Sequence, residues 1–343
     1  APPSPAIEDF VPPSSSRPPV LVTGGAGYIG SVTVARLLER GHRVRVLDNL
    51  LFGDDALAAH RSSPDLELLS GDVRDAAAVA RACAGIDGIL HLAGLVGDPA
   101  CALDPALTRA VNVDSTITLA EAAKAAGVRR LVFASTCSVY GAAGEAWLDE
   151  QSATGPVSLY AESNLESETL FQDRLQGSGV EPVTLRFATV FGVSPRMRFD
   201  LVVNLLTARA LREGVLEVHG GEQWRPQVHV DDVASALLLA LDQPRAAGRT
   251  YNVGSDALNL RIGELAQAIA ARFPAASLTV SETRDPRSYR VSFARITDEL
   301  GFRAEHSIDA GVAEIADWIH ARSGFDPAAV RYSNVRTLEA ALR

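Results

Sequence analysis

Three glycines near the start of the chain are spaced to hold a diphosphate. Gly24, Gly27 and Gly30 lie in Thr23-Gly-Gly-Ala-Gly-Tyr-Ile-Gly30, directly between an apolar stretch and a helical pattern. The first glycine permits a tight turn, the second lets the backbone approach a diphosphate, and the third lets the helix pack closely on the sheet. The N-terminus of the following helix then faces the phosphate charge. The segment predicts a dinucleotide-binding loop, with Tyr28 and Ile29 in the same site.

An acidic residue follows this loop at the distance that dinucleotide-binding folds require. Asp48 ends the next predicted strand, 18 residues after Gly30, and Asn49 comes directly after it. A carboxylate at this point accepts hydrogen bonds from an adenosine ribose 2′-hydroxyl and repels a 2′-phosphate. The sequence therefore predicts that the cofactor is NAD rather than NADP.

The elements that must position these residues alternate between strand and helix patterns. Strands are expected at 19–23, 43–48, 66–69, 88–92, 131–134 and 183–187, and helices at 28–40, 76–83, 105–126, 159–176, 200–213 and 262–272. Repeated βαβ units predict an α/β fold with a Rossmann-type, doubly wound parallel sheet and a smaller, interleaved C-terminal substrate domain. We expect a flexible Pro/Ser-rich leader at 1–19, a cofactor domain at 20–193 plus 227–256, and a substrate domain at 194–226 plus 257–325.

Composition excludes several classes of protein. The formal net charge of −10 argues against non-specific nucleic-acid binding, which needs a basic surface. Three cysteines, Cys83, Cys101 and Cys137, lack metal-ligand spacing, so neither a metal nor a disulfide framework is expected. No apolar run approaches the ~20 residues of a membrane span, and the first residues lack a signal-peptide pattern. We expect a cytoplasmic protein.

The glycine loop and four later segments resemble the extended short-chain dehydrogenase/reductase family, and within it the NAD-dependent nucleotide-sugar epimerase/dehydratase branch. The later segments are Gly71-Asp72-Val73, His91-Leu92-Ala93-Gly94, Ser135-Thr136-Cys137-Ser138-Val139-Tyr140-Gly141 and Tyr160-Ala-Glu-Ser-Asn164. The resemblance implies that Asp72 and Val73 lie at the adenine, and that Leu92, Ala93 and Gly94 line the cofactor. It also implies that Thr136 hydrogen-bonds the reacting sugar hydroxyl and that Tyr160 is the acid/base.

One position departs from the family pattern. The family places a lysine four residues after the tyrosine, where its charge lowers the tyrosine pKa from its ordinary value of ~10. That position is Asn164, beside the cofactor, and Lys124 is the only lysine of the chain. Three interpretations stay open: an enzyme activated by the cofactor's charge or an arginine, a deliberately substituted chain, and a protein that binds NAD and a ligand without turnover.

The residues after Thr136 bear on the type of reaction. Dehydratases of the family carry an Asp-Glu pair here, and decarboxylases a glutamate, whereas this chain has Cys137 and Ser138. Since elimination needs a positioned acid and base, the pattern favours C4 epimerisation, in which a sugar is transiently oxidised and hydride returns to its other face. Cys137 as an acid/base of an atypical dehydratase or keto-sugar reductase is an alternative, and a small packing residue is its ordinary role.

By the same resemblance, the later part of the chain holds a nucleotide-diphosphate sugar, contacted by Asn204, Arg225, Arg287 and Tyr289. Arg225 is expected to bind the diphosphate, and surface ion pairs are the alternative for both arginines. Arg196 and Arg198, around Met197, either grip an anionic group or are solvated. The resemblance also implies a homodimer formed through the helices at 105–126 and 159–176.

Overall fold

The computed structural model describes residues 18–282 and 287–343, and seven parallel strands form its central sheet. In spatial order these strands are β11 (Thr250–Val253), β7 (Glu181–Phe187), β5 (Arg130–Thr136), β4 (Gly88–His91), β1 (Val20–Thr23), β2 (Val44–Asp48) and β3 (Leu66–Ser70). Chain order reverses between β1 and β4, and such a reversal creates a crevice at the carboxyl ends of the strands. Both the glycine loop and Ser135-Thr136 lie at this edge.

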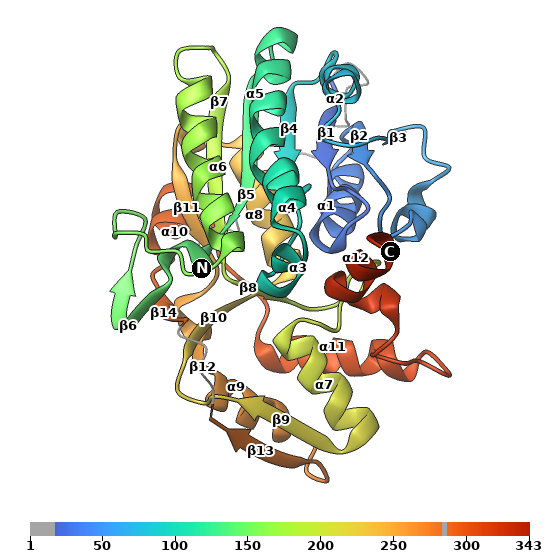
Figure 1. Ribbon diagram of the computed structural model, residues 1–343, viewed down its shortest axis with the longest axis vertical. Coiled ribbons are helices and arrows are strands. Elements are labelled where there is room, and N and C mark those ends of the chain that lie inside the picture. The colour runs from blue at the N-terminus through green and yellow to red at the C-terminus, as the bar shows by residue number, and fades with distance from the viewer. Residues whose placement is uncertain (1–17, 283–286) are drawn as a thin grey trace, which may run out of the picture.

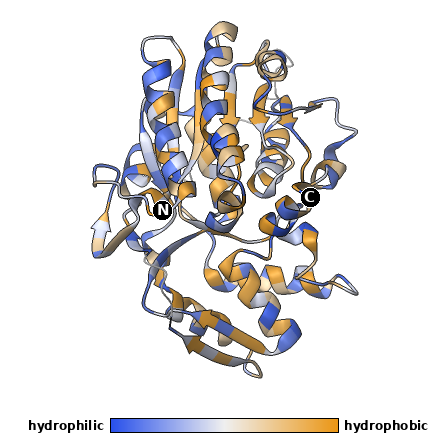
Figure 2. Ribbon diagram, in the orientation of Figure 1, coloured by the Kyte–Doolittle hydropathy of each residue, from blue (hydrophilic) through white to orange (hydrophobic). Residues whose placement is uncertain are grey.

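Helices cover both faces of the sheet (Figure 1). One face carries α1 (Tyr28–Glu39) and α8 (Val230–Asp242), and the other carries α2 (Ala76–Cys83), α5 (Ser115–Ala126) and α6 (Leu159–Leu175). Each face has its own apolar core, one between the sheet and α1/α8 and one beneath α2, α5 and α6. Figure 2 shows the strands of this sheet as mostly hydrophobic, as expected of a parallel sheet covered on both faces.

A second, smaller group of elements lies below the sheet in Figure 1 and has its own core. It contains α7 (Val202–Glu213), α9 (Ile262–Ala270), α11 (Ile308–His320), the parallel pair β9 (Val215–His219) and β13 (Ser277–Ser281), and the sheet β12 (Asn259–Arg261), β10 (Trp224–His229) and β8 (Thr189–Phe191). The remaining elements are α3 (Asp98–Leu103), α4 (Pro105–Arg109), β6 (Ala142–Leu148), β14 (Ser288–Val291), α10 (Ala294–Leu300) and α12 (Asn334–Ala341). Tyr28 and Val32 of α1 join this second core, so the glycine-loop helix contacts both parts.

A buried ion pair connects the helix of Tyr160 to the sheet. Glu168 on α6 accepts hydrogen bonds from Arg186 on β7, with Nη2–Oε2 at 2.7 Å and Nε–Oε1 at 3.0 Å. Ser135 on β5 donates its hydroxyl to the same carboxylate. Arg186 also donates to the Tyr140 hydroxyl at 3.0 Å. Although burial alone lowers the pKa of Arg186, its bonds to Glu168 raise this pKa overall.

The predicted fold class is confirmed, and most predicted elements differ from the observed ones by a few residues at their ends. The predicted helix at 105–126 is instead α4 and α5 joined by a π-helical turn at Ala110–Asp114. The expected elements include neither helices α10, α11 and α12 nor the edge strand β11. Most of the expected leader, residues 1–17, lies outside the described residues. Among the described helices, none is long and apolar enough to cross a membrane.

Replacing Glu168 by glutamine is expected to lower the free energy of unfolding by about 3 kcal/mol, because Arg186 keeps its buried charge and loses the opposing one. Denaturant unfolding measures this. Glu166→Gln on the same helix is the control: Glu166 and its partner Arg109 are both exposed, so its loss should cost less than about 1 kcal/mol. Equal effects of the two substitutions would contradict the importance of the buried pair.

Candidate functional site

A cavity of about 420 Å³ runs along the carboxyl edge of the sheet. Most residues predicted for the cofactor line it: Gly24, Gly27, Tyr28, Ile29, Gly30, Asp48, Asn49, Asp72, Val73, Leu92, Ala93, Gly94 and Tyr160. They come from the ends of β1, β2, β3 and β4 and from the first turns of α1 and α6. The fold therefore gathers segments far apart in sequence along one cavity.

The glycine loop has the geometry of a phosphate cradle. Gly24 has φ +73°, and a Cβ there would lie 2.7 Å from the backbone nitrogen of Ala93. A Cβ on Gly30 would collide with the carbonyl of Gly24. Helix α1 begins after Gly27 with no side-chain cap and no acidic residue in its first turn. Its first N–H groups are therefore open to an anion, and the positive end of the helix dipole favours one.

Asp48 lies at the end of the cavity formed by β2 and β3. Its carboxylate accepts hydrogen bonds from the backbone N–H of Ala26 at 3.0 Å and of Leu50 at 2.8 Å. Burial raises its pKa, against the effect of these two bonds. Asp72 lies next to it and pairs with Arg74, whose hydrogen bond lowers the Asp72 pKa. Asp48 thus holds the loop in place and also presents a carboxylate to the cavity.

These observations fit a dinucleotide. The glycine positions leave space that a side chain would fill, and α1 presents unsatisfied N–H groups. Within the described residues, the buried Nε and Nη2 of Arg196 and the Oδ1 of Asn334 have no hydrogen-bond partner, and both side chains line the cavity. Buried polar atoms without partners are uncommon in proteins without a ligand.

Tyr160 lies at the other end of the cavity, where β5 ends. Thr136, the last residue of β5, lies close to its side chain. Burial is the main cause that raises the pKa of Tyr160 above its ordinary value, whereas Thr136 and the charge of Arg198 lower it. Without a bound cofactor the tyrosine is therefore protonated at neutral pH.

Asn164 lies on α6 one helical turn after Tyr160 and is buried. Its Nδ2 donates to the Tyr160 carbonyl at 2.8 Å, within the helix. A second cavity of about 40 Å³, lined by Asn112, Asn164 and Ser167 among others, lies beside it. Lys124 does not occupy this cavity. Its Nζ pairs with Glu121 on α5 at 2.7 Å. The position that the family pattern gives to a lysine therefore holds the Asn164 amide, with a small cavity beside it.

Cys137 is not in the cavity, which corrects its assignment as a catalytic residue. It is fully buried, and its Sγ donates to the carbonyl of Arg186 at 3.2 Å. Burial raises the pKa of this thiol, so the thiolate is disfavoured. Cys137 packs in the core between β5 and β7, and the alternative reactions that depend on it lose their acid/base.

Asn204 also differs from expectation. It is fully buried on α7, where its Oδ1 accepts from the N–H of Gly192 at 3.1 Å and its Nδ2 donates to the carbonyl of Arg198 at 2.9 Å. Tyr28 donates to the carbonyl of Gly192 at 2.7 Å in the same network. Asn204 therefore connects the loop after β8 to α1, and its amide is engaged by protein atoms rather than presented to a ligand.

The other three residues predicted for the sugar-nucleotide lie together beside the segment 135–138. Arg225 lies over the ring of Tyr289 at 5.5 Å and donates to the carbonyl of Arg287. The Tyr289 hydroxyl is 3.3 Å from the Ser138 hydroxyl, two residues after Thr136. Arg287 pairs with Asp98 at the start of α3. The cluster thus begins next to Thr136 and extends away from the cofactor cavity.

Sequence reasoning missed one wall of the cavity. Helix α12 contributes Asn334, Leu338 and Ala341 to the lining, and Leu342 follows directly after the helix. Phe52, Arg196 and Arg198 also line it, from the loops after β2 and β8. From the sequence, Arg196 and Arg198 are equally compatible with an anion site and with solvated side chains. The heptad-like spacing of Asn334, Leu338 and Ala341 is compatible with a helix face, yet nothing in this spacing indicates that the face lines the cavity.

Comparison with known proteins gives the family. The family described as "NAD dependent epimerase/dehydratase family" matches residues 20–254. The chain belongs to this family. It is 30% identical over 309 residues to a UDP-glucose 4-epimerase of Corynebacterium glutamicum, covering 84% of this chain and 91% of the relative. It is also 30% identical over 315 residues to a dTDP-glucose 4,6-dehydratase of an Actinoplanes species, covering 88% and 98%.

A solved structure agrees with this assignment. The dTDP-glucose 4,6-dehydratase DesIV of Streptomyces venezuelae, with NAD bound, superposes with a TM-score of 0.80 at 30% identity. The match covers 89% of this chain and 98% of DesIV. The chain is thus an NAD-dependent nucleotide-sugar epimerase/dehydratase in the broad sense, and its cofactor is NAD.

Asp48→Asn is expected to reduce the preference for NAD over NADP by about tenfold or more, because the amide no longer repels a 2′-phosphate. Calorimetric titration with each dinucleotide measures the two affinities. Asp55→Asn, an exposed change in the following segment, is the control and should leave the ratio unchanged. An unaltered ratio in Asp48→Asn would show that the carboxylate does not select the cofactor.

Proposed function

We propose that the chain is an NAD-dependent nucleotide-sugar C4-epimerase whose rate is limited by Asn164. The observation that carries the proposal is the position of Tyr160 at one end of the cofactor cavity with Thr136 close to its side chain, beside positions 137 and 138 that carry no carboxylate. When bound, NAD supplies the acceptor and donor of hydride for a transient oxidation of the sugar. The chain's own residues supply the proton transfer and the orientation.

Tyr160 is the group placed to take the sugar hydroxyl proton. Tyr160 lines the cavity, and Thr136 lies close to its side chain, where the threonine hydroxyl can orient the same sugar oxygen by a hydrogen bond. General-base catalysis by a tyrosine requires the tyrosinate, so every unit by which the pKa lies above the working pH costs about tenfold in active enzyme. Arg198, which lines the cavity, is a cation of this chain that lowers the Tyr160 pKa.

Epimerisation fits the site better than dehydration. Elimination of water needs an acid and a base beside the sugar, and the buried Cys137 supplies neither. Asp98 is the carboxylate whose charge bears on Tyr160, but it accepts from Ser158 at 2.6 Å and pairs with Arg287. Reversal of configuration at C4 requires only proton transfer by Tyr160 and rotation of the oxidised sugar.

The nucleotide end of the substrate is assigned to Arg225, Arg287 and Tyr289. Their cluster is continuous with Ser138, so a sugar at Thr136 has its diphosphate directed toward the two guanidinium groups. Guanidinium groups bind diphosphates through paired, charge-assisted hydrogen bonds. The substrate domain in this proposal comprises 194–226 and 257–325, with α7, α9 and α11 as its main helices.

Two further expectations stay predictions: a cytoplasmic location and a homodimer through α5 and α6. The exposed residues of α6 include Glu162, Glu166, Thr169 and Asp173, all polar. The outer surface of this helix is therefore more polar than the sequence pattern suggested, and a dimer there would use charged contacts.

The turnover number should rise by about tenfold per pH unit between about pH 7 and pH 9, because the tyrosinate fraction grows while the raised pKa of Tyr160 lies above this range. The measurement is a pH profile of 4-epimer formation from UDP-glucose and dTDP-glucose, read by NMR. A rate that is flat over this interval would mean that Tyr160 is not the base.

Asn164→Lys should raise the turnover number at neutral pH by about 100-fold or more, since an ammonium group one helical turn from Tyr160 stabilises the tyrosinate. Thr169→Lys, which adds the same charge on the exposed face of α6, is the matched control and should leave the rate unchanged. Tyr160→Phe in the Asn164→Lys background should abolish turnover.

The same assay decides between functions. Turnover only in Asn164→Lys would identify the present chain as a protein disabled by one residue. Water loss in the product would identify a dehydratase. If Asn164→Lys binds NAD and remains inactive on both sugars, the epimerase proposal fails, and a non-catalytic NAD-binding protein, the candidate that Asn164 itself favours, takes its place.

A further inference from the structure

Arg196 is a buried cation at the cofactor cavity that the proposed chemistry does not use. Only 7% of its surface is exposed, and its guanidinium lies over the ring of Phe52 at 3.9 Å. Within 18–282 and 287–343, its Nε and Nη2 have no hydrogen-bond partner. Burying a charged group without hydrogen bonds is costly. A buried guanidinium without partners at a cavity wall is explained when a bound ligand accepts its hydrogen bonds.

The charges around Arg196 make this part of the cavity attractive to an anion. Arg198, two residues later, also lines the cavity and pairs with Asp200 at 2.9 Å. The positive charges of Arg196 and Arg198 are thus opposed by one carboxylate, that of Asp200. Burial and the neighbouring Arg198 lower the pKa of Arg196 to about 10, as expected for a cation that lacks an opposing charge. An arginine with this pKa is still protonated at neutral pH.

The loop that carries Arg196 is attached to the first turn of α1. Ser194 donates its hydroxyl to the carbonyl of Tyr28 at 2.7 Å and lies 3.1 Å from the Ser31 hydroxyl. The N–H of Arg196 in turn donates to Ser194 Oγ at 3.2 Å. Arg196 is therefore fixed near the open N-terminus of α1, where a dinucleotide places its diphosphate. Its stacking partner Phe52 follows Asp48 by four residues, at the ribose end.

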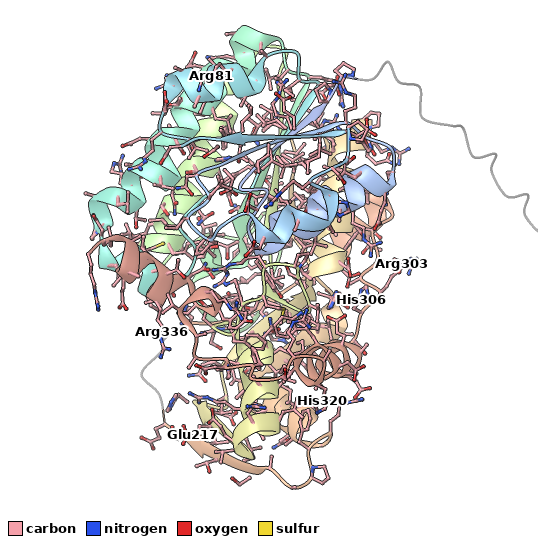
Figure 3. All side chains as sticks on the ribbon, turned by 90° about the vertical axis from the view of Figure 1, so that its right-hand side faces the viewer. Arg81, Glu217, Arg303, His306, His320 and Arg336 are labelled. Atoms are coloured by element: carbon pink, nitrogen blue, oxygen red, sulfur yellow. The ribbon has the colours of Figure 1, made fainter. Side chains whose placement is uncertain are left out.

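Helix α12 closes the cavity on the same side. Its first residue, Asn334, donates its N–H to Asp200 at 2.8 Å, so the carboxylate that pairs with Arg198 also holds the helix. The preceding segment is anchored by an aromatic cluster. The ring centroid of Phe199 lies 4.8 Å from that of Phe325 and 5.5 Å from that of Tyr332. Asn334 and Leu338 are buried against the cavity, and Figure 3 shows Arg336 on the outer side of α12.

We propose that Arg196 is a ligand of the cofactor's diphosphate, and that helix α12 is the cover that encloses it there. The N-terminus of α1 binds the diphosphate from one side and Arg196 from the other. The diphosphate of the sugar-nucleotide is the other possible source of the anion, but its predicted partners Arg225, Arg287 and Tyr289 do not line this cavity. The inference concerns NAD binding and does not depend on the epimerase reaction.

The test is calorimetric titration of the nucleotide-free full chain with NAD, ADP-ribose, adenosine, UDP and dTDP. Arg196→Gln should weaken NAD and ADP-ribose by about 10- to 100-fold, the usual effect of removing a charged hydrogen-bond partner, and leave adenosine, UDP and dTDP unchanged. Arg196→Lys, which keeps the charge, should recover part of the loss. Arg212→Gln, an exposed arginine on α7, is the matched control and should bind every ligand as the parent does.

The other outcomes overturn the proposal. Unchanged NAD binding with weaker UDP or dTDP binding would assign Arg196 to the substrate's diphosphate. Equal weakening of adenosine and NAD would assign it a structural role through Phe52. For α12, addition of NAD should slow amide hydrogen exchange in 334–341 in the parent, and much less so in Arg196→Gln at the same NAD concentration. Exchange that NAD leaves unchanged would show that α12 does not cover the bound cofactor.

Discussion

The buried ion pair between Glu168 and Arg186 is the interaction on which the geometry of the site depends. It joins three elements that carry or adjoin the reactive groups: α6 with Tyr160, β5 with Ser135-Thr136, and β7. A charge pair in the interior tolerates little displacement, because each partner would be left desolvated and uncompensated. This constraint sets the register between α6 and the sheet edge. The proximity of Thr136 to the Tyr160 side chain depends on that register.

In the proposed reaction, the buried ion pair therefore holds Tyr160 firmly in position, but Tyr160 is a weak base. Tyr160 is held where the family chemistry needs it, but burial raises its pKa and Asn164 supplies no charge to oppose this. Among the cations at the cavity, Arg198 lowers the Tyr160 pKa, and the nicotinamide ring of NAD would add a further positive charge when it is bound. Charge at a distance lowers a tyrosine pKa less than an adjacent ammonium does. Under the proposed function, a family member retains its architecture, its cofactor site and its proposed substrate cluster while one residue governs the rate.

The two parts of the molecule also meet at the cofactor through a second set of contacts. Ser194 and Asn204 attach the loop after β8 to α1, Asp200 attaches Arg198 to α12, and the aromatic cluster around Phe199 anchors the C-terminal segment. The cofactor cavity is consequently bounded by elements from both ends of the chain. Closing it requires the substrate part and α12 to be in place as well as the central sheet.

The sequence alone determined the sheet, the glycine loop, Asp48 and the missing lysine, because each depends on local order: hydrophobic periodicity, glycine spacing and one substitution within a helical turn. Only the tertiary structure decided which side chains face the cavity. Cys137 and Asn204 occur where ligand contacts were expected, yet packing turns both into the interior. Arg196 and α12 reach the cofactor through contacts spanning more than 100 residues, and no local pattern encodes such distances. Burial and long-range pairing are properties of the folded chain. The sequence specifies the type of a polar residue, but these two properties decide its role.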